Sequence, residues 1–200
     1  MISVTLGKMV SLCYNISIMK NYIVFDLEWN QSANGKERSI PHFPFEIIEI
    51  GAVKLNEAFQ MVDEFHRLIR PQVYTQMHHA ISEVTHMDMK ELRNSGELFP
   101  DAAAEFLSWC GGDAVFCTWG NMDLLELQRN MDYYHMDNPF PKPLFYYDVQ
   151  KLYGLFCREN ARISLDSAVE EQNLMEEKAA DEKLTEVAES SINMQAANEE

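Results

Sequence analysis

The 200-residue sequence has few basic residues and no long apolar run. Only 16 lysines and arginines stand against 32 aspartates and glutamates, which gives a formal net charge of −16. A protein that coats nucleic acid through its phosphates needs a basic surface, so the composition argues against that class. An enzyme that brings divalent cations to a phosphate is compatible with the same charge. No apolar stretch is long enough to cross a bilayer, so we expect no membrane partner.

Cysteine is also scarce, with four residues in the chain. Cys13, Cys110, Cys117 and Cys157 form no Cys-x-x-Cys pair and have no zinc-site spacing. We therefore expect reduced thiols in a cytoplasmic protein. The length and apolar content suit a single α/β domain with an ordinary core.

The negative charge is concentrated at the C-terminal end. Between residues 170 and 200, ten acids face two lysines, so this segment holds half of the net charge. The composition predicts an acidic tail over residues 176–200, loosely helical or disordered. The folded domain is expected over residues 21–175.

Residues 1–20 are mildly apolar, but Lys8 interrupts them and no small-residue cleavage site follows. This pattern does not favour a signal peptide. We expect a dispensable N-terminal extension upstream of a natural start at Met19. The alternative is an additional edge strand through residues 2–6.

The segment Asn21–Asn30 is predicted to organise the rest of the chain. Its first half, Tyr22 to Phe25, contains only aromatic and β-branched residues and is typical of a buried strand. Asp26 and Glu28 follow two residues apart, so they point to the same face of that strand. Two adjacent carboxylates repel each other, and a hard divalent cation such as Mg²⁺ relieves that repulsion. The alternative is that both acids lie at the frayed, solvent-exposed end of the strand and coordinate no ion.

The remaining pattern predicts hairpin strands followed by alternating strands and helices, which gives a mixed five-stranded sheet flanked by helices. Short helices are expected between His78 and Leu92. A further short helix is expected after Ser164 as N-cap. After the first strand, further strands are expected over residues 46–55, 59–70, 114–119 and 144–147. Longer helices are expected over residues 101–109, 122–134 and 148–156.

Asp123 follows the fourth predicted strand, in the first turn of a helix. An acid at this position is stabilised by the helix dipole, which is a sufficient explanation by itself. Ligands of α/β sheets, however, collect beyond the carboxyl ends of strands. If the first and fourth strands are neighbours, Asp123 lies near Asp26 and Glu28.

Three segments together resemble the DEDDh 3′–5′ exonucleases, which have a ribonuclease-H-like fold. They are Phe25–Glu28, Glu46–Val53 and Trp119–Asp123. The residues of these segments are most similar to those of the bacterial sporulation-inhibitor and RNA-trimming branch of that family. The resemblance implies hydrolysis of phosphodiesters at single-stranded RNA or DNA 3′ ends with two Mg²⁺ or Mn²⁺ ions, RNA being slightly favoured.

The resemblance also implies roles for individual residues. Asp26 would bridge both ions, Glu28 would hold the ion that activates water, and Asp123 would support the second ion. Trp29 and Asn30, directly after the carboxylates, are expected to contact the terminal nucleotide.

The third motif of the family, a histidine followed five residues later by an aspartate, is missing. Residues 176–200 contain no histidine, and Glu176 stands at the matching offset before Asp181. The histidines expected to lie on the surface or at helix caps (His78, His79, His86 and His135) do not replace it. Three explanations remain open: a truncated or divergent end, an acidic insertion before a lost segment, or substitution by Asp181 or a nearby glutamate. The sequence therefore predicts an impaired exonuclease or, alternatively, an inactive module that binds nucleic acid or protein.

Overall fold

The computed structural model describes residues 21–34, 39–140, 145–157, 162–176, 178 and 183. The predictions for residues 1–20 and for Asp181 lie outside this part of the chain. The chain separates into two compact units, Met1–Val149 and Gln150–Glu200. Across the described residues, no helix is both long and apolar enough to span a membrane.

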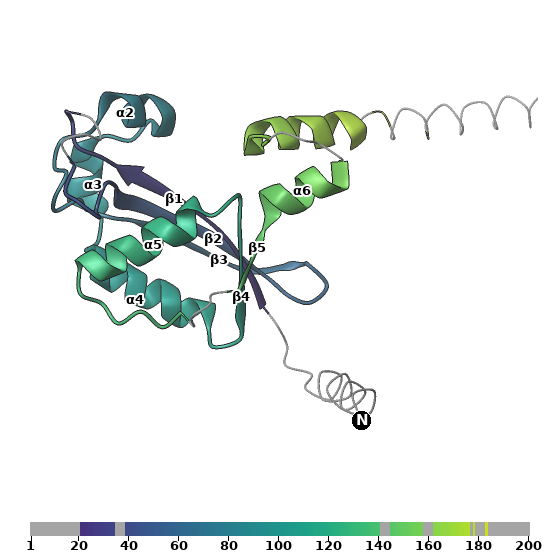
Figure 1. Ribbon diagram of the computed structural model, residues 1–200, viewed down its shortest axis with the longest axis horizontal. Helices are drawn as coiled ribbons and strands as arrows, with labels where there is room; N and C mark the ends of the chain where they lie inside the picture. Colours follow the sequence, from purple (N-terminus) through teal and green to yellow (C-terminus); the bar gives the residue numbers. More distant parts are fainter. Residues whose placement is uncertain are drawn as a thin grey trace, which may run out of the picture. The chain divides into compact units, whose positions relative to one another are not determined.

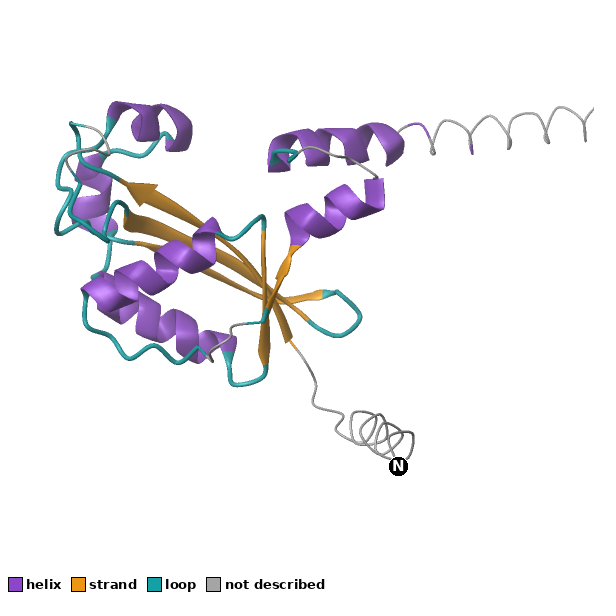
Figure 2. Cartoon of the chain, in the orientation of Figure 1, coloured by secondary structure: helices purple, strands orange, loops and turns teal. Residues whose placement is uncertain are grey.

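The first unit is built on a five-stranded mixed sheet with the strand order β3-β2-β1-β4-β5 (Figures 1 and 2). β1 pairs antiparallel with β2 and parallel with β4, so it is the central strand. The β2–β3 pair is antiparallel and the β4–β5 pair is parallel. The predicted mixed five-stranded sheet is thus confirmed. The strands are β1 (Asn21–Asn30), β2 (Glu46–Leu55), β3 (Met61–Leu68), β4 (Ala114–Thr118) and β5 (Tyr146–Asp148).

Two longer helices, α4 and α5, cover one face of this sheet (Figure 1). The rings of Phe25 on β1 and Phe65 on β3 lie 5.6 Å and 5.4 Å from the ring of Phe106 on α4. α5 adds Leu127 and Met131, neither of which has exposed surface. Burial of such side chains stabilises the unit by about 1.5–3 kcal/mol each. The helices are α2 (His79–Thr85), α3 (Met89–Ser95), α4 (Phe99–Cys110), α5 (Met122–Tyr133) and α6 (Val149–Cys157).

The predicted elements are present, but their ends differ. β3 is shorter than the expected 59–70, because Phe59 and Gln60 belong to the turn of the β2–β3 hairpin, where the N–H of Phe59 donates to Asn56. β5 includes Asp148, which pairs with Thr118, while Leu144 lies outside the described residues.

The second unit contains most of α6 and a helical segment over residues 165–176. Ser164 caps this segment as expected, because its hydroxyl accepts a 3.2 Å hydrogen bond from the N–H of Ser167. The hydroxyl of Tyr153 donates to Glu171 at 2.9 Å, which joins α6 to the segment.

Candidate functional site

The two acids of β1 lie on the sheet face opposite α4 and α5. Phe25 and Leu27 point into the core, each with 3% of its surface exposed. Asp26 and Glu28 alternate with them, and Asp26 is exposed while Glu28 is half-buried. A bulge between Glu28 and Trp29 ends the regular pairing with β2 directly after the second acid. The local alternation of the strand therefore places both carboxylates side by side, as the sequence predicts.

Asp123 reaches this site because β4 is shorter than β1. The β1–β4 pairing ends at Val24 and Cys117, which leaves the β4-facing edge of β1 unpaired beyond that point. Asp123, in the first turn of α5, accepts the N–H of Leu27 through Oδ1 at 3.2 Å. Gly120, with φ of 95°, makes the turn from β4 into α5 in a conformation that favours glycine. Asp123 is only 5% exposed, and its bond to Leu27 lies between the two acids of β1.

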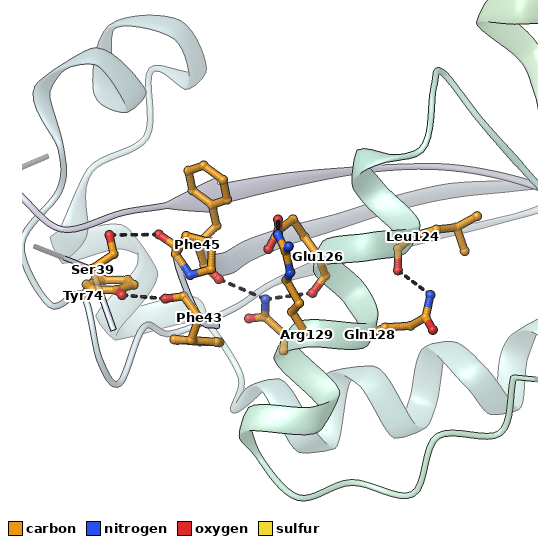
Figure 3. A network of polar contacts seen from close by, with 10 residues as sticks. Ser39, Phe43, Phe45, Tyr74, Leu124, Glu126, Gln128 and Arg129 are labelled. Atoms are coloured by element: carbon orange, nitrogen blue, oxygen red, sulfur yellow. Dashed lines mark hydrogen bonds and ion pairs between the residues drawn. The ribbon is translucent and has the colours of Figure 1, made fainter. Parts of the chain in front are cut away.

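The position of α5 is fixed by Asn130, which lies two turns beyond Asp123 and is bonded to the backbone of Phe45 and of Glu126 (both labelled in Figure 3). Its side-chain oxygen accepts the N–H of Ile47 at 3.0 Å, and its amide donates to the carbonyl of Phe45 at 3.0 Å. The amide also donates to the carbonyl of Glu126 at 2.9 Å. Asn130 has no exposed surface, so water does not compete for these hydrogen bonds. They attach α5 to the beginning of β2 and thereby hold Asp123 against β1.

A fourth carboxylate, Glu49, belongs to the same face, although sequence analysis gave it no role. Glu49 lies directly opposite Glu28 in the antiparallel β1–β2 pair. Residues opposite each other in such a pair share a face, and like charges there are destabilising. Its partner is His66 on β3, whose Nε2 is hydrogen bonded to Oε1 of Glu49. Only the β1–β2 and β2–β3 registers reveal this contact.

The four carboxylates influence one another electrostatically. Burial raises the pKa of Asp123 to about 6, with a second contribution from the charge of Asp26 and opposition from the N–H of Leu27. Burial raises the pKa of Glu28, and the charges of Asp26, Glu49 and Asp123 raise it further. Although part of the surface of Asp26 is exposed, its pKa is raised by partial desolvation and then by the charge of Glu49. Asp26, Glu28 and Asp123 therefore hold their protons more tightly than an isolated carboxyl would, because each has a raised pKa.

The donor set suits a hard divalent cation, because it consists of carboxylate oxygens that raise one another's pKa. Among the described residues, however, no group of three His, Cys, Asp or Glu side chains is arranged to hold a metal ion. Asp123 is tied to Leu27, whereas Asp26 is exposed and Glu28 half-buried.

Trp29 and Asn30 have different environments. Trp29 is half-buried, with its ring 5.6 Å from that of Phe45, and a nucleotide contact by Trp29 stays a prediction. Asn30 has no exposed surface, and its amide donates to the carbonyls of Tyr74 and Gln76 at 2.8 Å and 2.9 Å. Its side-chain oxygen accepts the N–H of His78 at 3.0 Å. Asn30 therefore holds the segment that leads into α2 beside the end of β1.

Comparison with known proteins is consistent with this geometry. The family model described as RNase_T, an exonuclease family, matches residues 23–181. No curated protein sequence matches the chain. Among solved structures, the chain is similar to the nuclease domain of 3′hExo, a DEDDh family member bound to rAMP, with a TM-score of 0.58 and 23% identity over 71% of this chain and 72% of that chain.

Two further solved structures show the same fold at lower identity. One is cell-death related nuclease 4, with a TM-score of 0.57 and 15% identity over 72% of this chain and 50% of that chain. The other is E. coli exonuclease I in complex with a dT13 oligonucleotide, with a TM-score of 0.56 and 12% identity over 68% of this chain. The chain spans only 30% of that exonuclease I chain. These likenesses establish the ribonuclease-H-like exonuclease fold.

Proposed function

The chain belongs to the RNase_T exonuclease family, and from that membership we propose that it is a metal-dependent 3′–5′ exonuclease acting on single-stranded nucleic-acid ends. The observation that carries the proposal is the hydrogen bond from Leu27 to Asp123, which lies beside Asp26 and Glu28. Three acids from two separate segments meet there at the carboxyl ends of two neighbouring strands. Substrates of open α/β sheets bind at such ends.

In this proposal Asp26, Glu28 and Asp123 are the cation ligands. Mg²⁺ or Mn²⁺ ions, when bound, would supply Lewis-acid stabilisation of the phosphate and a more acidic water. The raised pKa values of Asp26 and Glu28 support this assignment, because a bound cation would favour the deprotonated forms that desolvation and neighbouring negative charges disfavour.

The proposed substrate class is inferred from the ligands of the similar solved structures and from the position of Trp29 in the sequence. One neighbour was crystallised with rAMP and another with dT13, so both RNA and DNA ends fit this fold. We expect RNA to be slightly favoured. In this proposal Trp29, directly after Glu28 on β1, stacks on the terminal base, a contact worth roughly 1–3 kcal/mol. A cytoplasmic location accords with this substrate.

The second candidate function is an inactive module that binds nucleic acid without cleaving it. It is favoured by residues 136–200, none of which is a histidine, since the resemblance implies a third motif that contains one. The binding module and an impaired enzyme both accept a single-stranded end. They differ in whether the bound strand is shortened.

The test is release of mononucleotides from 3′-labelled single-stranded RNA and DNA with Mg²⁺, with Mn²⁺, and with chelator. We expect cation-dependent release that Asp26→Ala abolishes, because loss of a ligand worth several kcal/mol lowers the rate by roughly 1,000-fold or more. Glu64→Ala is the matched control, an exposed acid on β3. Strand binding without release by the unmodified protein would favour the binding module instead.

A further inference from the structure

His66 lies in the same cross-strand row as Asp26. The register pairs Asp26 with Gly51 and Gly51 with His66, each in an antiparallel pair. Opposite residues share a face, so the imidazole of His66 and the carboxylate of Asp26 are on the same side of the sheet. Two strand spacings separate their Cα atoms by about 10 Å. That distance leaves room for a water and a phosphate between the two side chains.

Gly51 keeps this row open. It has no side chain, and a Cβ built there would meet nothing closer than the carbonyl oxygen of Asp26 at 4.0 Å. The space above Gly51 is bordered by Asp26 on β1 and by His66 on β3. A larger residue at this position would separate the two groups.

The orientation of the His66 ring is set by Glu49. Nε2 is hydrogen bonded to Oε1 of Glu49, which lies opposite Glu28. The side chain of Glu49 is 21% exposed, while that of His66 is 62% exposed. A mostly covered carboxylate thus holds an imidazole whose other side is open to solvent. With Nε2 donating to Glu49, the lone pair lies on Nδ1.

No other histidine of the described residues forms an ion pair with a carboxylate. His78 and His79 lie at the beginning of α2, where their ring centroids are 4.6 Å apart and the rings are tilted by 34°. His135 follows the end of α5 with φ of 54°. Nucleophilic attack by water requires a proton acceptor near the acids of β1, and His66 has both the chemistry and the position for that role.

We propose that His66, oriented by Glu49, is the general base of the exonuclease reaction, a proposal that rests on the proposed function. A water above Gly51 loses a proton to Nδ1 of His66 while its oxygen forms a bond to the phosphorus. The bond from phosphorus to the 3′ oxygen of the remaining strand breaks, and that oxygen keeps the electron pair and takes a proton from solvent. His66 then returns its proton to solvent. Glu49 is a positioning residue, because it acts through the imidazole.

The activity test compares His66→Ala, Glu49→Gln and the control Glu64→Ala, which alters the same strand and the same face. We expect His66→Ala to lower kcat roughly 100- to 10,000-fold with little change in KM, which is the usual contribution of a general base. Glu49→Gln should lower kcat less, and Glu64→Ala should change neither constant. Added imidazole should restore part of the rate of His66→Ala and none of the rate of Asp26→Ala. His66 is exposed, so thermal unfolding should confirm that its variants fold.

A second readout does not depend on activity. In NMR spectra, substoichiometric Mn²⁺ should broaden the ring signals of His66 in the unmodified protein and leave them sharp in Asp26→Asn. The control is the ring of His135, because ten residues of α5, 124–133, separate it from Asp123 by about 15 Å.

The outcomes distinguish the two proposals. Activity that is lost in Asp26→Ala but kept within threefold in His66→Ala overturns the role of His66 and leaves the nuclease proposal standing. Sharp His66 signals in the presence of bound Mn²⁺ overturn it as well. Absence of both nucleotide release and Mn²⁺ binding in the unmodified protein overturns the two proposals together.

Discussion

The carboxylate of Asp123 accepts the backbone N–H of Leu27 at 3.2 Å, across 96 residues of sequence. This bond satisfies a donor on β1 that would otherwise lack a strand partner, since β4 has ended by this point. It also places a nearly buried acid beside Asp26. One contact thus closes the edge of the sheet and completes the acid cluster.

Replacing Asp123 by Asn should remove the pH dependence that this burial creates. The pKa of Asp123 is about 6 in the folded chain and 3.8 ordinarily, so the folded chain binds this proton more tightly. The resulting stability is fully present below pH 3.8 and is lost as the pH rises through about 6. Asp123→Asn keeps an acceptor for Leu27 without the charge. We expect it to be more stable than the unmodified protein by up to about 3 kcal/mol at pH 7.5 in chelator, and to differ little at pH 4.

Urea unfolding followed by tryptophan fluorescence at these two pH values measures the difference. Mg²⁺ should stabilise the unmodified protein at pH 7.5 and have little effect on Asp123→Asn, since the variant lacks one proposed ligand. A variant that is less stable than the unmodified protein at pH 7.5 in chelator would contradict the expectation.

Gly51→Ala should separate stability from activity. A methyl group at Gly51 meets only the carbonyl oxygen of Asp26 at 4.0 Å, so we expect a change in unfolding free energy within about 0.5 kcal/mol. The methyl group enters the space between Asp26 and His66, and we expect nucleotide release to slow roughly 10- to 100-fold. Gly96→Ala is the contrasting variant, since its Cβ would lie 2.4 Å from the carbonyl oxygen of Leu92 and 2.6 Å from the nitrogen of Arg70. It should lose about 1–3 kcal/mol of stability. Full activity in Gly51→Ala would show that this space is not used.

Asn130→Ala should destabilise the protein strongly. The substitution removes three hydrogen bonds and leaves the N–H of Ile47 buried without its acceptor. A buried group that loses its partner costs about 1–3 kcal/mol, so we expect a total loss of roughly 2–5 kcal/mol in urea unfolding. Asn94→Ala on the exposed surface of α3 is the control and should change stability by less than about 0.5 kcal/mol. Equal stability of the two variants would show that Asn130 does not anchor α5.

Glu46→Gln should be destabilising although it removes a buried charge. The carboxylate of Glu46 is 1% exposed and accepts the N–H groups of Gln72, Val73 and Tyr74 and the hydroxyl of Tyr134. A glutamine turns an NH₂ group toward some of these donors, and we expect a loss of about 2–4 kcal/mol in the free energy of unfolding. Glu64→Gln on the exposed face of β3 should be neutral. A neutral Glu46→Gln would mean that the segment after β3 is held by other contacts.

Local patterns determined most of what sequence analysis predicted correctly. The alternation of β1 put Asp26 and Glu28 on one face, and Ser164 was predicted as the N-cap of the helical segment that follows it. Such features depend on residues a few positions apart. The short β3 was misjudged because the turn of the hairpin, not the apolar content of Phe59, ended the strand.

The order of strands and helices, the two acids of β1 and the likeness of three segments to an exonuclease family could all be read from the sequence. Three contacts could not: Glu49 opposite Glu28, the hydrogen bond between His66 and Glu49, and the attachment of α5 to β2 by Asn130. The physical reason is that the side a strand residue faces follows from the alternation of its own backbone. Its neighbour across the sheet depends instead on the register between strands, which is fixed by the hairpin turn and the packing of the whole core.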